Sequence, residues 1–152
     1  MKKKILVGLL ILFVLAQAIQ PSKNQGDVNA SQDISAAFPV SENVMQILKK
    51  SCYDCHSNYT SYPWYDHITP INWWVYSHIK EGKWELNFNE FASYSSRKQL
   101  KKLKEIAETV EEDEMPLPSY LITHGDARLN IDQKKLLIDW ARKISGEIGE
   151  RN

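Results

Sequence analysis

Four stretches of the chain carry apolar residues at the three- and four-residue spacing of an amphipathic helix. They predict helices over residues 41–52, 70–81 and 132–145, and a further helix that begins at residue 96 and ends before Pro116. No stretch shows the sustained alternation of apolar and polar residues that is typical of a strand. The pattern therefore predicts an all-α fold of about four helices.

Residues with known preferences for helix ends bound these segments. Asn130 is expected to cap the last helix, and Gln133 three residues later completes a capping box. A second capping box is expected from Ser96 and Gln99. Gly82 is placed to end the second helix, since glycine is the commonest residue just beyond a helix.

The middle of the chain is unusually aromatic. Twelve of the 16 aromatic residues lie between Tyr53 and Tyr94. Large rings either close the core of a small domain or surround a flat ligand. We expect this long aromatic-rich segment to form a buried shell, with one apolar face of helix 70–81 made by Ile71, Trp74, Val75, His78 and Ile79.

The first 20 residues have the pattern of an export signal. Three lysines precede an apolar run from Ile5 to Leu15, which ends in the small-x-small sequence of residues 16–18. The run from residue 5 to residue 19 is shorter than the roughly 20 residues that cross a bilayer, which favours a cleaved signal peptide. An uncleaved N-terminal membrane anchor has the same pattern, so a tether through residues 5–19 stays open. Either way, we expect a periplasmic protein or one on the outer face of the inner membrane.

The length of 152 residues allows one compact domain and a short appendage. Residues 21–37 are polar and small, without helical or strand periodicity, which predicts a flexible linker. The folded domain is therefore expected over residues 38–148. Because 19 Lys and Arg balance 19 Asp and Glu, no basic excess is present to neutralise phosphates, and we expect no nucleic-acid partner.

The two cysteines of the chain fall in one motif, Cys52-Tyr53-Asp54-Cys55-His56. This is the C-x-x-C-H sequence of c-type haem attachment. On a helix, positions i, i+3 and i+4 face the same side, so two thiols can bond the haem vinyl groups while the imidazole ligates the iron. Export agrees with this prediction, because the same motif in a cytosolic protein would suggest metal or thiol redox chemistry.

Three other interpretations of the cysteines stay open. A thiol–disulfide redox pair would need a βαβ context that the pattern lacks. A zinc site would need further ligands from the remaining histidines, and no second ligand pair has a suitable spacing. A structural disulfide is the third.

The sixth position of a haem iron held by His56 has several candidate ligands. Met115 is the first choice, since Pro116 can fix a loop that presents its thioether. His78 is the alternative distal ligand. His67 and His124 are expected in loops, and an open sixth position is the remaining possibility. The carbonyl of Pro63 is a candidate acceptor for the ring N–H of His56.

At this level of detail the chain resembles small class I c-type cytochromes. More narrowly, it is similar to the exported bacterial haem-binding domain family in the segments CYDCHSNYTSYPWY, INWWVYSHIKEGKWELNF, DEMPLPSY and LIDWA. The resemblance covers about residues 40–145. It implies a cytochrome-c-like domain with one covalent haem c, in which Cys52 and Cys55 are the thioether sites and His56 is the proximal ligand. Met115 matches the Met-Pro position of the family, and His78 also falls on a patterned position.

The function expected from these features is single-electron transfer with redox partner proteins of the cell envelope. Such a protein is not an enzyme, and no catalytic residue is implied. Two alternatives have different requirements. A haem-based sensor or peroxidase-like protein needs an open or labile sixth ligand, whereas a thiol–disulfide oxidoreductase would use Cys52 and Cys55 as free thiols.

Overall fold

The computed structural model describes residues 1–150 as an all-α protein, which confirms the predicted fold class. Within these residues, the β-structure consists of one isolated bridge between Gln25 and Tyr59. The α-helices are α1 (Lys2–Ala16), α2 (Ile34–Ala37), α3 (Glu42–Ser51), α4 (Ile71–Glu85), α5 (Ser96–Glu111), α6 (Pro118–Leu121) and α7 (Ile131–Gly149), and the 3-10 helices are η1 (Trp64–His67), η2 (Phe88–Ser93) and η3 (Gly125–Ala127).

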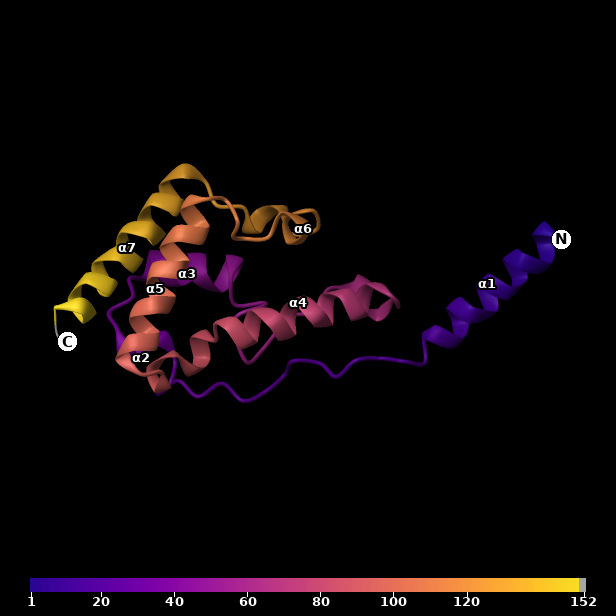
Figure 1. Ribbon diagram of the computed structural model, residues 1–152, viewed down its shortest axis with the longest axis horizontal. Coiled ribbons are helices and arrows are strands. Elements are labelled where there is room, and N and C mark those ends of the chain that lie inside the picture. Colours follow the sequence, from indigo (N-terminus) through magenta and orange to yellow (C-terminus); the bar gives the residue numbers. More distant parts are fainter. Residues whose placement is uncertain (151–152) are drawn as a thin grey trace.

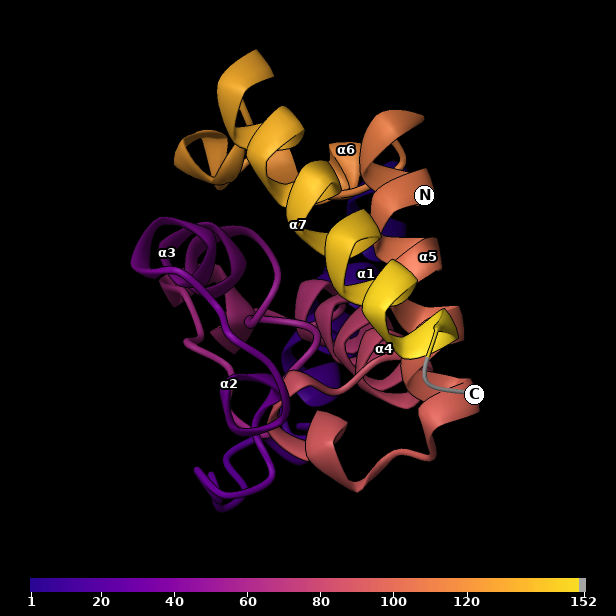
Figure 2. The ribbon, with the colours of Figure 1, turned by 90° about the vertical axis from the view of Figure 1, so that its left-hand side faces the viewer.

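The core lies where α5 packs along α7 and α3 packs on α7 (Figures 1 and 2). Its apolar side chains come from the helical stripes that the sequence pattern predicts, and η2 adds two phenylalanines. The side chains that are almost completely buried include Val44, Leu48, Phe88, Phe91, Leu103, Leu137 and Ile144. Burial of these stripes is the main stabilisation available to helices of this length.

Two of the predicted helix ends can be compared with the structure in atomic detail. The capping box of α7 is confirmed, with Asn130 Oδ1 accepting from Gln133 N at 2.8 Å and the Gln133 side chain accepting from Asn130 N at 3.0 Å. The capping box predicted at Ser96 is wrong, because α5 is capped by the preceding residue, Ser95. Gln99 turns instead toward η2, where its Nε2 donates to the Phe91 carbonyl at 3.1 Å.

Helix α4 is longer than the sequence suggests. It begins after Pro70 as expected, but it runs through Gly82 and ends at Glu85. The prediction that Gly82 ends the helix is therefore wrong. Gly82 serves a packing contact inside the helix, described with the site below.

The predicted buried aromatic shell is also wrong for all four tryptophans of the aromatic-rich segment. Side chains of Trp64, Trp73, Trp74 and Trp84 are 76%, 40%, 47% and 82% exposed. Helix α4 projects away from α5 and α7 (Figure 1), and 8 of its 15 residues are exposed. Its buried residues are Asn72 and Ile79, rather than the broad apolar face that we expected.

The segment expected as a flexible linker lies against the rest of the molecule. Residues 17–33, called the strap below, run beside α4 (Figure 1). Backbone hydrogen bonds join Gly26 N to the Asn58 carbonyl at 2.8 Å and Thr60 N to the Asn24 carbonyl at 2.9 Å. Ile34, immediately after the strap, is fully buried in the core. The packed part of the chain therefore begins before residue 38, contrary to our expectation.

Helix α1 lies at the end of the molecule opposite α5 and α7, beyond the tip of α4 (Figure 1). None of its residues is buried. A search of residues 1–150 finds no helix with both the length and the apolarity needed to cross a membrane.

Candidate haem site

The C-x-x-C-H motif follows directly on α3. The helix ends at Ser51, whose Oγ donates to the Ala127 carbonyl at 2.8 Å, and Cys52 is the C-cap. Within the motif, His56 N donates to the Cys52 carbonyl at 2.9 Å. The motif is thus one separate helical turn with a single i to i+4 bond, rather than part of a regular helix as the spacing suggested. This turn is enough to keep residues 52 and 56 on the same side.

The ring of His56 is oriented by the C-terminal part of α4. Its Nδ1 lies 2.8 Å from the Gly82 carbonyl oxygen and 3.1 Å from the Leu86 carbonyl oxygen. Because a carbonyl oxygen can only accept, Nδ1 carries the proton and Nε2 keeps its lone pair. A backbone acceptor on the other nitrogen is the usual support of a metal-binding histidine. The acceptor predicted from the sequence, Pro63, is wrong, since its carbonyl accepts from Asp66 N.

Gly82 allows α4 to approach the motif this closely. A Cβ atom at this position would lie 3.1 Å from Cys55 Cβ, 3.3 Å from the Cys55 carbonyl oxygen and 3.4 Å from His56 Cε1. Any larger residue would push α4 away from the motif or displace the imidazole. Gly82 therefore has two roles: its carbonyl orients the His56 ring, and its lack of a side chain leaves space for that ring.

Cys52 and His56 face a cavity of about 270 Å³ between the motif, α5 and α7. Met115 lies on its wall, with its backbone N–H donating to the Thr109 carbonyl at 3.1 Å. Most of the lining is apolar, as a large flat prosthetic group requires. The lining residues include Cys52, His56, Leu86, Phe88, Ile106, Val110, Met115, Pro116 and Leu137.

The structure brings together some of the predicted site residues and separates others. Cys52, His56 and Met115 line one cavity, and Cys55 packs beside Gly82. His78 is not among the lining residues; its Nδ1 lies 2.9 Å from the Trp74 carbonyl and its ring centroid is 4.3 Å from that of Trp74. The donor set therefore fits a haem iron between a histidine and a methionine.

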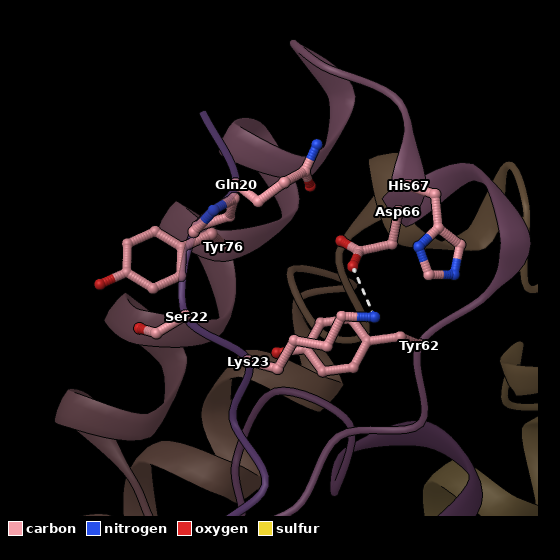
Figure 3. Close-up of a pocket in the computed structure, with 8 residues that line it drawn as sticks. Gln20, Ser22, Lys23, Tyr62, Asp66, His67 and Tyr76 are labelled. Carbon is pink, nitrogen blue, oxygen red and sulfur yellow. Dashed lines mark ion pairs between the residues drawn. The ribbon is translucent and has the colours of Figure 1, made fainter. Parts of the chain in front are cut away.

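The other two histidines lie outside this cavity. His124 stacks on Tyr120 with ring centroids 4.1 Å apart. His67 lines a separate pocket of about 260 Å³ between the strap and α4, together with Lys23, Tyr62 and Asp66 (Figure 3). In that pocket Lys23 Nζ lies 3.8 Å from the Asp66 carboxylate, and burial raises the pKa of Asp66.

The electrostatic environment distinguishes the thiols from those of redox enzymes. Burial, with a further contribution from Cys55, raises the pKa of Cys52 to about 12, and burial with the nearby Asp54 raises the pKa of Cys55 to about 11. Reactive cysteines have a lowered pKa, so neither thiol is activated as a nucleophile. Burial lowers the pKa of His56, which keeps the imidazole in the neutral form that binds metals.

A buried cation on the cavity wall was not expected from the sequence. Lys102 is 8% exposed, and its Nζ lies 3.1 Å from Glu85 and 2.7 Å from Glu105. Burial opposes its charge, but the hydrogen bonds to these two glutamates outweigh burial and raise its pKa. All three side chains line the cavity, so they set the charge beside any bound group.

Sequence reasoning missed three residues of the site: Gly82, Leu86 and Lys102. The signal for Gly82 was present, because a glycine within an amphipathic stretch indicates either a helix end or a close contact. We interpreted it as a helix end. Neither the carbonyl of Leu86 nor the burial of Lys102 has a local signature.

Comparison with known proteins agrees with a haem-binding role for this cavity. No curated protein and no solved structure matches the chain. The model of one protein family, described as a haem-binding domain, matches residues 11–143 and so includes the motif, α4, the cavity and most of α7. With nearly its whole length covered by this model, the chain belongs to the haem-binding domain family.

Proposed function

We propose that this haem-binding protein carries one covalent haem c and transfers single electrons in the cell envelope. The observation that carries the proposal is the placement of Cys52, His56 and Met115 on one apolar cavity, with Nε2 of His56 left free because Nδ1 donates to the Gly82 carbonyl. A protein that only captured loose haem would not need two cysteines at this spacing.

Each residue has a defined role in this proposal. The Cys52 and Cys55 thiols would hold the haem covalently, each by addition to a vinyl group that leaves a thioether on the sulfur and the thiol proton on the vinyl carbon. His56 and Met115 would hold the iron. When bound, haem supplies reversible one-electron oxidation of its iron. The apolar side chains that line the cavity would exclude water from the haem.

Electron transfer is favoured over the two alternatives by particular contacts. A sensor or peroxidase-like protein requires an open or labile sixth position, whereas Met115 is held on the cavity wall by its bond to Thr109. A thiol–disulfide oxidoreductase requires an ionised thiol, and burial raises the pKa of both cysteines. We therefore propose an electron carrier without catalytic residues, whose partners are redox proteins of the envelope.

The position of residues 1–20 supports a retained anchor rather than a cleaved signal peptide. Gln17 bonds to both backbone groups of Thr69, accepting from its N–H at 2.9 Å and donating to its carbonyl at 3.1 Å. Cleavage after the small-x-small sequence of residues 16–18 would remove Gln17 and these bonds. We propose that the chain stays tethered through residues 5–19 on the outer face of the inner membrane.

The covalent attachment is tested by producing the full chain with haem-maturation machinery and denaturing it. Haem that stays with the polypeptide through acid-organic extraction, and is lost from the Cys52→Ala/Cys55→Ala variant, is the expected result. Complete extraction of haem from the unmodified chain would refute covalent attachment while leaving non-covalent haem binding in place.

The axial ligand is tested by comparing Met115→Ala with Met45→Ala. Met45 is a partly buried methionine packed on the core, away from the cavity lining, so it controls for loss of a thioether elsewhere. We expect Met115→Ala to lose the low-spin absorption spectrum and to lower the reduction potential, with Met45→Ala unchanged. A shift in His78→Ala and none in Met115→Ala would assign the distal position to His78.

A further inference from the structure

Helix α1 presents an apolar surface on every side. The apolar side chains from Ile5 to Leu15 are each between 46% and 68% exposed, and none is buried. Three lysines precede this surface, and the last turn carries no basic residue. Such a helix has no partner in the described chain, and its surface matches lipid better than water.

The first residues of the strap, directly after α1, are fixed to the start of α4 by polar contacts. Besides the two bonds between Gln17 and Thr69, Asn72 Nδ2 donates to Gln20 Oε1 at 2.6 Å. Trp73 Nε1 donates to the Ile19 carbonyl at 2.9 Å. Thr69 and Asn72 are 1% and 0% exposed, so the contacts made by these two residues are largely shielded from water. The start of α4 therefore lies next to the C-terminal end of α1, where its apolar surface ends.

Exposed large side chains gather at the same place. Ile71, Trp73 and Trp74 of the first turn of α4 are 40–47% exposed, and Trp64 of the adjacent η1 is 76% exposed. We call these four residues the aromatic tip. Tryptophan is enriched where a membrane meets water, because its ring is apolar and its N–H is polar. The aromatic tip thus continues the apolar surface of α1 with the residue type suited to the headgroup layer.

We infer that the aromatic tip of α4 lies in the headgroup layer of the membrane that holds α1, so that the protein contacts lipid at two adjoining surfaces. This inference rests on the proposed tether. At 1.5 Å per residue, α1 is about 22 Å long, less than the roughly 30 Å of hydrocarbon in a bilayer. A short inserted helix draws the tip at its end toward the interface.

The consequence concerns the haem site. Gly82, which contacts the motif, lies 11 residues along α4 from Ile71, or about 16 Å at 1.5 Å per residue. With the tip in the headgroups, α4 becomes a spacer that holds the cavity at a fixed distance from the lipid. A protein tethered by α1 alone would lack this defined orientation.

Two positions on α4 provide a matched test. Trp74→Cys lies in the aromatic tip, and Trp84→Cys lies near the other end of the same helix, where the native side chain is 82% exposed. The haem-loaded full chain is reconstituted in phosphatidylcholine and phosphatidylglycerol vesicles and floated. The rate of modification by a polyethylene-glycol maleimide is then measured for each cysteine, with the unmodified chain as the background for Cys52 and Cys55.

We expect position 74 to react at least tenfold more slowly than position 84 in the floated protein. The protection should disappear when Leu9→Lys/Leu12→Lys is added, since these positions of α1 are more than half exposed and the lysines prevent insertion. Equal rates in the floated protein would overturn the contact at the tip but leave the tether intact. Failure of the protein with an unchanged α1 to float would overturn both the tether and the contact at the tip.

One further outcome identifies a different occupant. Protection of position 74 that persists with Leu9→Lys/Leu12→Lys and increases with protein concentration would assign the tip to a second copy of the chain and overturn the lipid contact. Haem loading is measured separately on each sample by its absorption spectrum. Failure of haem attachment is therefore distinguished from failure of the membrane contact.

Discussion

The helical core and the α4 arm, by which we mean α4 and the residues 64–70 before it, are stabilised in different ways. In the core, α5 and α7 bury continuous apolar stripes against each other, and side chains such as Leu103 and Ile144 have no exposed surface. In the arm, the first-turn apolar residues are exposed, and the buried positions include the polar residues Thr69 and Asn72. Apolar residues in the core therefore serve stability, whereas those on the arm are available for contact with another surface.

The proposed haem site lies where these two regions meet. The core provides the cavity through α5, α7 and the loop at Met115, and the arm provides the carbonyl that orients His56. Changes in the core should therefore alter stability, changes at the junction should alter the site, and changes at the far end of the arm should alter neither.

The largest expected effect is on the free energy of unfolding, which should fall for a change in the core and stay nearly constant for a change in the arm. Leu103→Ala removes a fully buried side chain of α5, and we expect the free energy of unfolding to fall by about 2–5 kcal/mol. Trp84→Ala removes a larger side chain from the arm, but one that is 82% exposed, so its effect should stay within about 0.5 kcal/mol. Urea unfolding of the haem-loaded chain measures both. Similar losses for the two variants would contradict the comparison.

The second prediction concerns the thiols at the core end of the junction. In the folded haem-free chain, a pKa of about 11 for Cys55 against an ordinary value of 9.0 leaves about one hundredth of the usual thiolate at pH 8. Alkylation by iodoacetamide should be about a hundredfold slower than in the urea-unfolded chain. Equal rates in the two states would show that burial does not protect these thiols.

The same thiols determine a pH dependence of stability. Both folded pKa values are raised, so above pH 9 the unfolded chain loses its thiol protons first and is stabilised relative to the folded chain. The stability of the haem-free chain should therefore fall as the pH rises from 9 to 11. The Cys52→Ala/Cys55→Ala variant should lack this component.

The third prediction tests the junction. In Gly82→Ala, the added methyl group would meet Cys55 and His56 at 3.1–3.4 Å, and relieving this contact costs about 1–3 kcal/mol. The gain of up to about 1 kcal/mol from alanine in a helix should not offset that cost. We expect lower stability and a shifted haem spectrum. Gly146→Ala in α7 is the matched control, because nothing lies within 4 Å of its added Cβ, and it should be neutral or stabilising.

The smallest expected effect lies at the far end of the arm. Gln17→Ala removes both bonds to Thr69, which are worth about 1 kcal/mol locally. We expect the amide of Thr69 to exchange with solvent about fivefold faster, while the midpoint of global unfolding does not change. Hydrogen exchange followed by mass spectrometry measures this change. A clear drop in the unfolding midpoint would mean that the strap stabilises the core.

The parts that sequence reasoning predicted are those encoded locally. The buried stripe of α5, the capping box of α7 and the C-x-x-C-H turn each depend on residues within a few positions of one another. The exposure of the tryptophans was not predictable in this way. Periodicity identifies a helix, but it does not determine whether a partner covers the apolar face, and α4 has little cover.

By itself, the sequence determined the all-α class, the main helices of the core and the haem motif with Met115 as a candidate ligand. Only the tertiary structure decided which carbonyl orients His56, since Gly82 is 26 residues away, and which charge lines the cavity, since Lys102 pairs with Glu85 across 17 residues. It also placed the first residues of the strap, directly after α1, against the start of α4, through bonds that span 52 residues. The physical reason is that hydrogen-bond partners and burial depend on distances in space, which local spacing along the chain does not specify.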